Sequence, residues 1–462
     1  MIRLFKHYVP YPVLLLGLID FALLMVAAQA GWALRLWQMS GALDADAARL
    51  PNMFAFAVTL QAAMVAVGVY GMQAIRSVRF AVARLMVAVM LGIILLSLVF
   101  FVAPPVSFWR SSLLYAMWLG LIAMTGVRIL ARDLLGGERF KRRVMVLGAG
   151  PRAARIEALA GSNGAGFAVV GYVGMNDGPV AVASAVNRDA IPSLPDHLLS
   201  LGAGEVVLAL EERRNALPLN DLLKIKTTGV LVHDFSSFLE RETGRVDLDS
   251  LNPSWLIFSD GFSAGQRLSR FAKRLFDVAA SLALLLTTLP LIALTALAVR
   301  LESKGPAFYR QRRVGLYGQP FDVIKLRSMR TDAEIGGIAV WAQKDDPRVT
   351  RIGRIIRKLR IDEIPQAWSV LKGEMSFVGP RPERPQFVAD LEQRLPYYAE
   401  RHVVKPGITG WAQINYPYGA SFEDAREKLE FDLYYAKNYT PFLDLLILLQ
   451  TARVVIWPEG AR

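Results

Sequence analysis

VAASLALLLTTLPLIALTALAV, residues 278–299, is an apolar run of 22 residues, which is long enough for a helix to cross a bilayer. Pro290 lies near its middle, where it removes a helix hydrogen bond and kinks the helix. Basic residues flank both ends, with Lys273 and Arg274 before the run and Arg300 after it. A full span would carry the second basic group across the membrane against the positive-inside rule. The run therefore predicts a helix that enters and leaves the same leaflet and breaks at Pro290; a proline-kinked transmembrane helix is the alternative.

Four further apolar stretches precede this run, each near the length that crosses a bilayer: residues 13–36, 53–72, 85–102 and 113–130. On one side their loops hold eleven cations: Arg3, Lys6, Arg76, Arg79, Arg84, Arg128, Arg132, Arg139, Lys141, Arg142 and Arg143. On the other side they hold three: Arg35, Arg49 and Arg110. The N-terminus and everything after the fourth stretch should therefore be cytoplasmic. Asp20, inside the first stretch, is expected to pair within the helical bundle.

Composition narrows the classes of function. Hydrophobic residues make up 53% of the 462 residues, which is too apolar for a disordered or an ordinary soluble chain. The chain has no cysteine and only four scattered histidines, so disulfides, zinc–thiolate sites and a cysteine nucleophile are excluded. The net charge of +13 fits cytoplasmic loops and anionic headgroups, and we expect no nucleic-acid partner.

An alternating β/α block is predicted from residue 140 to residue 262. Residues 144–147 read as a buried strand, and GAGPRA at 148–153 follows it with the glycine spacing of a dinucleotide-binding turn. Further strands are expected at 167–173 and 205–210. The acidic residue that such sites place about 20 positions later is missing. We therefore expect a Rossmann-like domain without a cofactor; a nucleotide bound as a regulator is the alternative.

Residues 348–365 predict a basic amphipathic helix. An apolar stripe at helical spacing comprises Ile352, Ile355, Ile356 and Leu359, and a cationic stripe recurs every third residue as Arg348, Arg351, Arg354, Arg357 and Arg360. Such a helix suits the membrane interface. A solvated basic face over a protein core is the alternative.

An acid pair, Asp362 and Glu363, follows this helix. Pro365 favours the first turn of a new helix at 365–372, which Gly373 should end. A helix N-terminus and nearby arginines lower the pKa of a carboxylate and attract phosphate. Adjacent carboxylates suit a division of labour, with one as nucleophile and the other on a divalent cation.

Three more segments add cations and turn residues. Residues 321–327 alternate like a strand and carry Lys325 and Arg327, and residues 377–382 hold Arg381 between two prolines. Residues 405–413 form a turn-rich loop. From residue 266 onward the chain has 30 Lys/Arg against 21 Asp/Glu, and arginine offers a planar fork for phosphate oxygens. A cationic, membrane-lying site with a carboxylate pair indicates a substrate that combines phosphates with a lipid.

These segments together resemble a known family. The motifs are FYRQRRVG at 308–315, KLRSM at 325–329, DEIPQ at 362–366, GPRP at 379–382 and KPGITGW at 405–411. They are similar to motifs of the bacterial sugar transferases, monotopic phosphoglycosyl transferases that start exopolysaccharide, O-antigen or glycan assembly, and the match covers residues 266–462. The layout resembles the long form of the family. It implies a membrane protein of α plus α/β class, with a four-helix transmembrane bundle at 1–135, a Rossmann-like domain at 140–262, a re-entrant membrane helix at 266–300 and a mainly helical cytoplasmic catalytic domain at 301–462.

The resemblance implies a reaction at the bacterial inner (cytoplasmic) membrane. A sugar 1-phosphate passes from a UDP-sugar to polyprenyl (undecaprenyl) phosphate, which gives polyprenyl-diphosphate-sugar and UMP. By position, Asp362 would attack the β-phosphate and Glu363 would hold Mg²⁺. The phosphate-binding side chains would be Lys325, Arg327, Arg357 and Arg381. Membrane lipids are implied as partners, and a homodimer is compatible with the family.

One departure from the family pattern concerns the re-entrant helix. The family often breaks this helix at Ser-Pro, whereas this chain has Leu289-Pro290. We expect Thr287 or Thr288 to supply the hydroxyl that serves the freed backbone.

Three other interpretations compete with this one. A membrane-bound nucleotide-sugar dehydratase would need a Tyr-x-x-x-Lys pair, and no lysine here has tyrosine four residues earlier. A polytopic transferase of the same reaction would need many more spans than these four or five apolar segments. A non-catalytic assembly scaffold is the third, and the intact Asp362–Glu363 pair argues against it.

Overall fold

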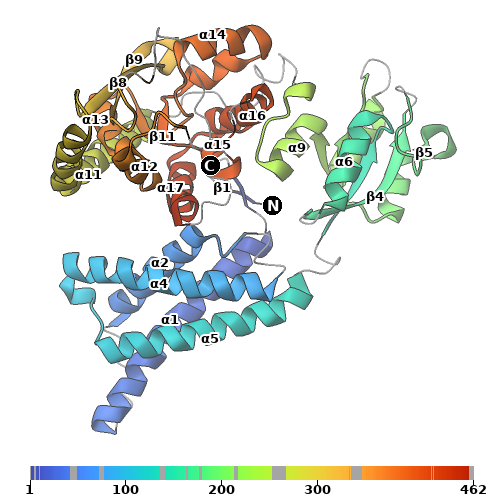
Figure 1. Ribbon diagram of the computed structural model, residues 1–462. Coiled ribbons are helices and arrows are strands. Elements are labelled where there is room, and N and C mark those ends of the chain that lie inside the picture. Colours follow the sequence, from blue (N-terminus) through green and yellow to red (C-terminus); the bar gives the residue numbers. More distant parts are fainter. Residues whose placement is uncertain are drawn as a thin grey trace. The chain divides into compact units, whose positions relative to one another are not determined.

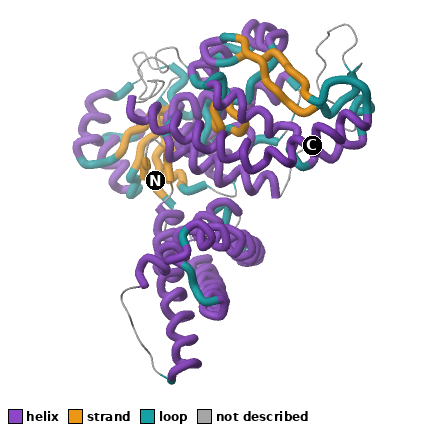
Figure 2. Tube along the Cα trace, turned by 90° about the vertical axis from the view of Figure 1, so that its left-hand side faces the viewer, coloured by secondary structure: helices purple, strands orange, loops and turns teal. Residues whose placement is uncertain are grey.

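The computed structural model describes residues 2–4, 7–9, 11–41, 49–71, 77–135, 141–162, 165–175, 179–212, 217–251, 267–331, 333, 346–417, 419 and 421–456. The predicted boundaries at residues 140, 262 and 266 lie outside the described residues. The chain divides into two compact units, residues 1–4 with 8–250 and residues 5–7 with 251–462. Helices are the main secondary structure (Figure 2).

Four long apolar helices of the first unit pack on one another (Figure 1). They are α1 Tyr11–Ser40, α2 Leu50–Val67, α4 Val78–Val102 and α5 Arg110–Leu135, and the structure also has the 3-10 helix η2 Pro104–Val106 and the short strands β1 Ile2–Leu4 and β2 His7–Val9. All four helices are long and apolar enough to cross a membrane. A Cβ on Gly31 of α1 would lie 2.6 Å from the backbone nitrogen of Ala116, so glycine allows α1 and α5 to approach closely.

Asp20 pairs within these helices, as predicted. Its carboxylate accepts hydrogen bonds of 3.1 and 2.6 Å from Arg128, and both side chains are buried. The prediction that Arg128 counts among the loop cations is wrong, because its side chain is buried within the helices and its charge is compensated by Asp20. Without Arg128 the eleven cations of that side become ten against three, so the sign of the charge difference is unchanged.

A five-stranded parallel sheet follows in the same unit, with strand order β5-β4-β3-β6-β7. Its elements are β3 Arg142–Leu147, α6 Pro151–Gly161, β4 Phe167–Gly174, β5 Val186–Asn187, η4 Arg188–Ala190, α7 Leu194–Ser200, β6 Glu205–Leu208, α8 Leu219–Thr227, β7 Leu231–Asp234, α9 Phe235–Thr243 and η5 Leu248–Ser250. Val144 and Val146 are buried in one apolar cluster and Met145 and Leu147 in another, so β3 is covered on both faces. The three predicted strands are confirmed. The sequence did not predict β5, which has two residues, or β7, in which two of the four residues are polar.

The glycine turn after β3 lies against the backbone of Ala209 and the side chain of Glu211. Gly148 has φ 123°, and a Cβ there would lie 2.4 Å from the carbonyl oxygen of Ala209. The backbone nitrogen of Arg152, at the start of α6, donates to the Glu211 carboxylate at 2.9 Å. Glu211 thus places a negative charge at the end of the helix where a dinucleotide-binding turn would bind phosphate.

The second unit combines α11 Arg267–Glu302 with a mixed set of short strands and helices. These are β8 Phe308–Val314, η6 Leu316–Gly318, β9 Pro320–Leu326, α12 Arg351–Lys358, η8 Ile361–Gln366, α13 Ala367–Lys372, β10 Ser376–Val378, α14 Pro385–Arg394, η9 Tyr398–Val403, β11 Gly407–Thr409, α15 Trp411–Asn415, α16 Phe422–Asn438 and α17 Pro441–Ile456. Strands β8 and β9 form an antiparallel hairpin, and β10 pairs with β11 in parallel.

Helix α11 is bound to the rest of this unit near both ends. Arg274 donates to the carbonyl oxygens of Val370 and Leu371 at 2.7 and 2.6 Å. At the other end, the Glu302 carboxylate accepts from the backbone nitrogen of Arg351 at 2.8 Å and so caps α12. Between these two contacts, most leucines of α11 are exposed.

Helical structure is continuous through Pro290, so a break at this residue stays a prediction.

The expectation that a threonine hydroxyl donates to the backbone carbonyl freed by Pro290 is wrong. Thr287 and Thr288 each donate to the carbonyl four residues earlier, at 2.7 and 2.6 Å, whereas Pro290 deprives Leu286 of its helical donor. The acceptor four residues earlier is the one that a helical threonine hydroxyl reaches without leaving its rotamer.

The basic amphipathic helix is shorter than predicted, because Thr350 caps α12 by accepting from the backbone nitrogen of Gly353 at 2.9 Å. The residues of its apolar stripe differ in burial. Ile356 is buried against α11 and β9, whereas Ile355 and Leu359 are 58% and 61% exposed. Helix α12 therefore covers a protein core with one edge and presents apolar side chains outward with the other.

Removing one charge of the Asp20–Arg128 pair should destabilise the protein more than removing both. Arg128→Met leaves the Asp20 carboxylate buried without a partner and should lower stability by roughly 3–5 kcal/mol. The double variant, Asp20→Leu with Arg128→Met, should unfold at a temperature close to that of the wild type. Thermal unfolding in lipid nanodiscs measures both variants, and equal losses in the single and double variants would contradict this account of the pair.

Candidate active site

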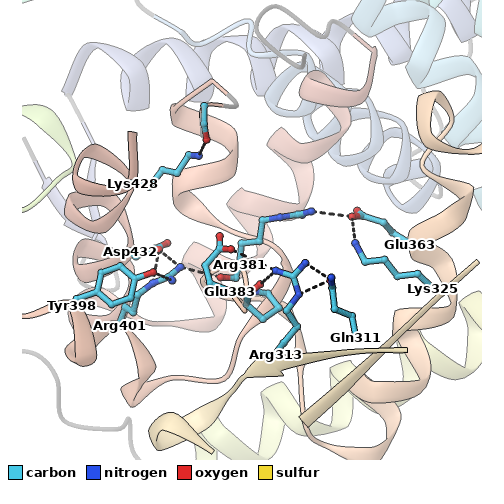
Figure 3. Close-up of polar contacts among 12 residues, drawn as sticks. Gln311, Arg313, Lys325, Glu363, Arg381, Glu383, Tyr398, Arg401, Lys428 and Asp432 are labelled. Atoms are coloured by element: carbon cyan, nitrogen blue, oxygen red, sulfur yellow. Dashed lines mark hydrogen bonds and ion pairs between the residues drawn. The ribbon is translucent and has the colours of Figure 1, made fainter. Parts of the chain in front are cut away.

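One face of the β8–β9 hairpin carries Lys325, which contacts the acid pair, and Arg313, which contacts the Pro382 carbonyl beside Arg381. Tyr309 lies opposite Lys325 and Arg313 opposite Phe321, so Lys325 and Arg313 share a face of the hairpin. Gln311, between them on β8, accepts hydrogen bonds from Arg313 (Figure 3). The period of two along the strands thus selects which basic residues can reach the site.

The acid pair lies in the 3-10 helix η8, between α12 and α13. Arg360 has φ 57°, a left-handed conformation that few residues other than glycine adopt. This turn ends α12 and brings Arg360 Nη1 to 3.5 Å from Glu363 Oε2. Pro365 lies inside η8 and not, as predicted, in the first turn of the next helix. That helix, α13, ends at Lys372 with Gly373 as its C-cap, as predicted.

Glu363 is surrounded by positive charge (Figure 3). Its Oε1 accepts from Lys325 Nζ at 2.9 Å and from Arg381 Nη2 at 3.2 Å. Burial alone would raise the pKa of Glu363, but the charges of Lys325 and Arg381 outweigh it and hold the pKa well below its usual range. Burial lowers the pKa of Lys325, and the Glu363 charge opposes that shift. Glu363 is therefore ionised at neutral pH.

Asp362 differs from its neighbour in both contacts and charge. It is 8% exposed, and its Oδ1 has no hydrogen-bond partner among the described residues. Burial, and next the charge of Glu363, raise the pKa of Asp362. Lys325 and Arg357 oppose this shift. The prediction that nearby arginines lower both pKa values is wrong for Asp362, because desolvation and the ionised neighbour outweigh them.

A rigid turn, residues 380–382, points Arg381 at Glu363. The turn follows β10, and Gly407 N donates to the carbonyl oxygen of Pro380 at 2.9 Å. A Cβ on Gly379 would lie 2.1 Å from the carbonyl oxygen of Lys405, so only glycine allows this approach of the two chains. The turn-rich loop predicted from the sequence therefore supports the Arg381 turn.

The structure gathers most of the predicted site residues. Lys325 and Arg381 contact Glu363, and Arg357 is close enough to lower the pKa of Asp362.

Arg327 lies apart from this cluster. Its guanidinium donates to the carbonyl oxygens of Lys304 and Ser303 at 2.6 and 2.8 Å, at the end of α11. Strand β9 ends at Leu326, so the alternation that directs Lys325 to the site does not extend to Arg327. Phosphate binding by Arg327 stays a prediction, and these contacts do not support it.

Three further arginines build the site without having been singled out as site residues. Arg360 contacts Glu363, and its place in the cationic stripe, two residues before Asp362, is a usable signal. Arg313 donates to the carbonyl oxygen of Pro382 at 2.9 Å, and Arg401 donates to that of Arg381 at 3.0 Å. These bonds join residues 69 and 20 positions apart, which no local pattern reveals.

Comparison with known proteins places this site in a family. Residues 268–458 match the family model described as bacterial sugar transferase. A UDP-glucose:undecaprenyl-phosphate glucose-1-phosphate transferase of Xanthomonas campestris pv. campestris is 32% identical over 371 residues, which cover 74% of this chain and 73% of that protein. The chain belongs to the bacterial sugar transferase family. The matched region contains the hairpin, the acid pair and the Arg381 turn.

Other relatives align over shorter parts. A UDP-N-acetylgalactosamine-undecaprenyl-phosphate N-acetylgalactosaminephosphotransferase of Aeromonas hydrophila is 43% identical over 231 residues, 50% of this sugar transferase and 53% of that protein. An undecaprenyl-phosphate glucose phosphotransferase of Komagataeibacter xylinus is 45% identical over 194 residues, 41% of this chain and 36% of that protein. The alignments span 53% and 36% of these two curated relatives.

Proposed function

We propose that this sugar transferase moves a sugar 1-phosphate from a UDP-sugar to polyprenyl (undecaprenyl) phosphate, giving polyprenyl-diphosphate-sugar and UMP. The acid pair carries the proposal: Glu363 is bound by two cations, and Asp362 beside it has a buried oxygen with no partner among the described residues. Phosphoryl transfer depends on positioning and charge neutralisation more than on acid–base chemistry. The names of the relatives, which specify undecaprenyl phosphate, support the same reaction as a first membrane step of exopolysaccharide or glycan assembly.

Asp362 is the proposed nucleophile. One carboxylate oxygen attacks the β-phosphorus of the UDP-sugar, the bond from that phosphorus to the bridging oxygen breaks, and UMP leaves with the electron pair. The phosphosugar is then held on Asp362 as an acyl phosphate. An oxygen of polyprenyl phosphate attacks the same phosphorus and releases the carboxylate. One diphosphate replaces another, so the reaction needs no external energy source.

The cations of the site are proposed to bind the phosphates. Lys325 and Arg381 converge from the hairpin and the turn on one carboxylate oxygen, so a diphosphate beside Glu363 would lie within reach of both. The charge of Arg357, near the end of α12, lowers the pKa of Asp362. Arg357 is the third of these proposed phosphate-binding cations. Charge of this kind stabilises the negative oxygens of a phosphoryl-transfer transition state.

We propose that Glu363 holds Mg²⁺. Mg²⁺ is usually bound by one or two carboxylates together with substrate phosphates. Glu363 Oε2 is the donor that fits this pattern, because its contact with Arg360 is long, at 3.5 Å, and the substrate phosphates would supply further oxygens. Bound there, the ion would neutralise charge on the diphosphate and stabilise the departing UMP.

Helix α11 is proposed to enter and leave the cytoplasmic leaflet. Lys273 pairs with Asp444 at 2.6 Å near one end and Glu302 caps α12 at the other, so both ends bind a single polar unit. A span would place these ends on opposite sides of the membrane. Between them, exposed apolar side chains face outward for lipid: Leu282, Leu286, Leu289, Leu291, Leu294 and Leu297.

The first unit is proposed to anchor this catalytic unit at the bacterial inner membrane. Its four apolar helices would form the transmembrane bundle, and the loop charges place the catalytic unit in the cytoplasm. The sheet order β5-β4-β3-β6-β7 grows outward in both directions from its first strand, as in Rossmann-like domains.

UMP release tests the proposed reaction. The purified full chain, with Mg²⁺, undecaprenyl phosphate and a panel of UDP-sugars, should release UMP from one or two of them. Asp362→Asn should lower the rate at least about a thousandfold, because it removes the nucleophile at nearly constant shape. Asp390→Asn, on an exposed face of α14, is the matched control and should keep the wild-type rate. Full activity of Asp362→Asn would refute the nucleophile.

Cysteine labelling tests the proposed topology, since the native chain has no cysteine. Arg270→Cys and Arg310→Cys, on either side of the apolar run, should both react only from the cytoplasmic side. Arg110→Cys, before the fourth apolar stretch, should react only from the opposite side and serves as control. Labelling of residues 270 and 310 from opposite sides would instead establish a fifth span.

A further inference from the structure

Arg401 is joined to the acid pair through a single residue (Figure 3). Its Nη2 donates to the backbone carbonyl oxygen of Arg381 at 3.0 Å, and the side chain of Arg381 donates to Glu363 at 3.2 Å. Arg401 therefore acts on the backbone of the residue whose side chain reaches the site.

Buried partners fix the guanidinium of Arg401. Its Nη2 and Nε donate to one carboxylate oxygen of Asp432 at 2.6 and 3.0 Å, and its Nη1 donates to the Tyr398 hydroxyl at 2.8 Å. The side chains of Arg401 and Asp432 are 5% and 3% exposed. All three guanidinium nitrogens are engaged, so the planar fork has one orientation. Helix α16 supplies Asp432, and thereby orients a group that belongs to η9.

The Arg381 turn is held by its carbonyl groups. Pro380 and Pro382 have no N–H to donate, so their amide nitrogens offer no hydrogen bond that could orient the turn. The three carbonyl oxygens of the turn accept from three different donors, Gly407 N, Arg401 Nη2 and Arg313 Nη1. Of these, Arg401 holds the carbonyl of Arg381 itself.

The burial of this ion pair favours an orienting role over a stabilising one. A pair as deeply buried as Arg401–Asp432 gains little net stability, because desolvation offsets the attraction of its charges. Two apolar side chains could fill the same space, but they could not donate to the Arg381 carbonyl. We propose that Arg401, oriented by Asp432, is a positioning residue that aims Arg381 at Glu363 and at the substrate phosphates. This rests on the proposed function, in which Arg381 binds phosphate.

Arg401→Lys is the most direct variant. Lysine keeps the charge beside Asp432, but one ammonium cannot hold Asp432, Tyr398 and the Arg381 carbonyl in the same geometry. We expect kcat/KM for UMP release to fall about 10- to 100-fold, the effect of misplacing a catalytic group by about 1 Å. Arg394→Lys, which changes an exposed arginine of the same unit, is the matched control and should keep the wild-type value.

A double-mutant cycle separates positioning from a structural role. In an Arg381→Ala background, Arg401→Lys should lower kcat/KM by less than about twofold further, because no guanidinium remains to be aimed. An equal fall in both backgrounds, or wild-type activity of the single variant, would overturn the proposal. If Arg401→Lys does not fold, Tyr398→Phe removes one anchor and enters the same cycle, with an expected fall of about two- to fivefold.

Hydrogen exchange tests the positioning apart from the activity. The amides of Gly379 and Gly407 donate to Thr409 and Pro380 across the base of the turn. Both should exchange at least about tenfold faster in Arg401→Lys, and unchanged exchange would overturn the proposal. The two proposals can fail separately. If the wild-type chain releases no UMP but these amides exchange faster in the variant, the proposed function is refuted, whereas the role of Arg401 in holding the turn is supported.

Discussion

The carboxylate of Glu363 is the contact on which the catalytic unit depends. It brings together Lys325 from β9, Arg381 from the turn after β10 and Arg360 from the end of α12. Without this negative charge the three cations would repel one another within one small volume. Their combined field keeps Glu363 ionised, and that ionised carboxylate in turn helps to raise the pKa of Asp362. Two adjacent acids therefore have pKa values shifted in opposite directions.

The same framework links the site to the apolar helix α11. Asp277 of α11 accepts from the Ser376 hydroxyl and the Phe377 backbone nitrogen at 3.0 and 3.2 Å. These two residues belong to β10, which leads directly into the Arg381 turn. The apolar helix and the Arg381 turn are thus directly connected by hydrogen bonds. That arrangement suits the proposed acceptor, whose phosphate would reach the acid pair while its lipid tail stayed in the bilayer.

Sequence reasoning succeeded where a local pattern carries the information. Among the described residues, hydrophobic runs located the five helices that are long and apolar enough to cross a membrane, but not the shorter apolar helix α17; the strands β3, β4 and β6 were also located. The motif around Asp362 and Glu363, and the proline-flanked Arg381, identified the parts that the structure gathers into one site.

It failed where the deciding contact is long-range. Arg327 follows Lys325 by two residues, yet β9 ends between them and Arg327 caps α11 instead. The raised pKa of Asp362 depends on burial by distant elements, which a count of nearby arginines does not register. Arg401 gains its role from Asp432, 31 positions away, and neither residue belongs to a recognisable motif.

In the proposed reaction, Asp362 becomes covalently bound to the phosphosugar. The most direct measurement is peptide mass spectrometry of the full chain after reaction with its UDP-sugar in the absence of acceptor. Cleavage after Arg360 and Lys372 yields a peptide of residues 361–372, whose fragments distinguish Asp362 from Glu363. We expect a phosphosugar on Asp362 that disappears when undecaprenyl phosphate is added. UMP release without any adduct, or an adduct on another residue, would contradict it.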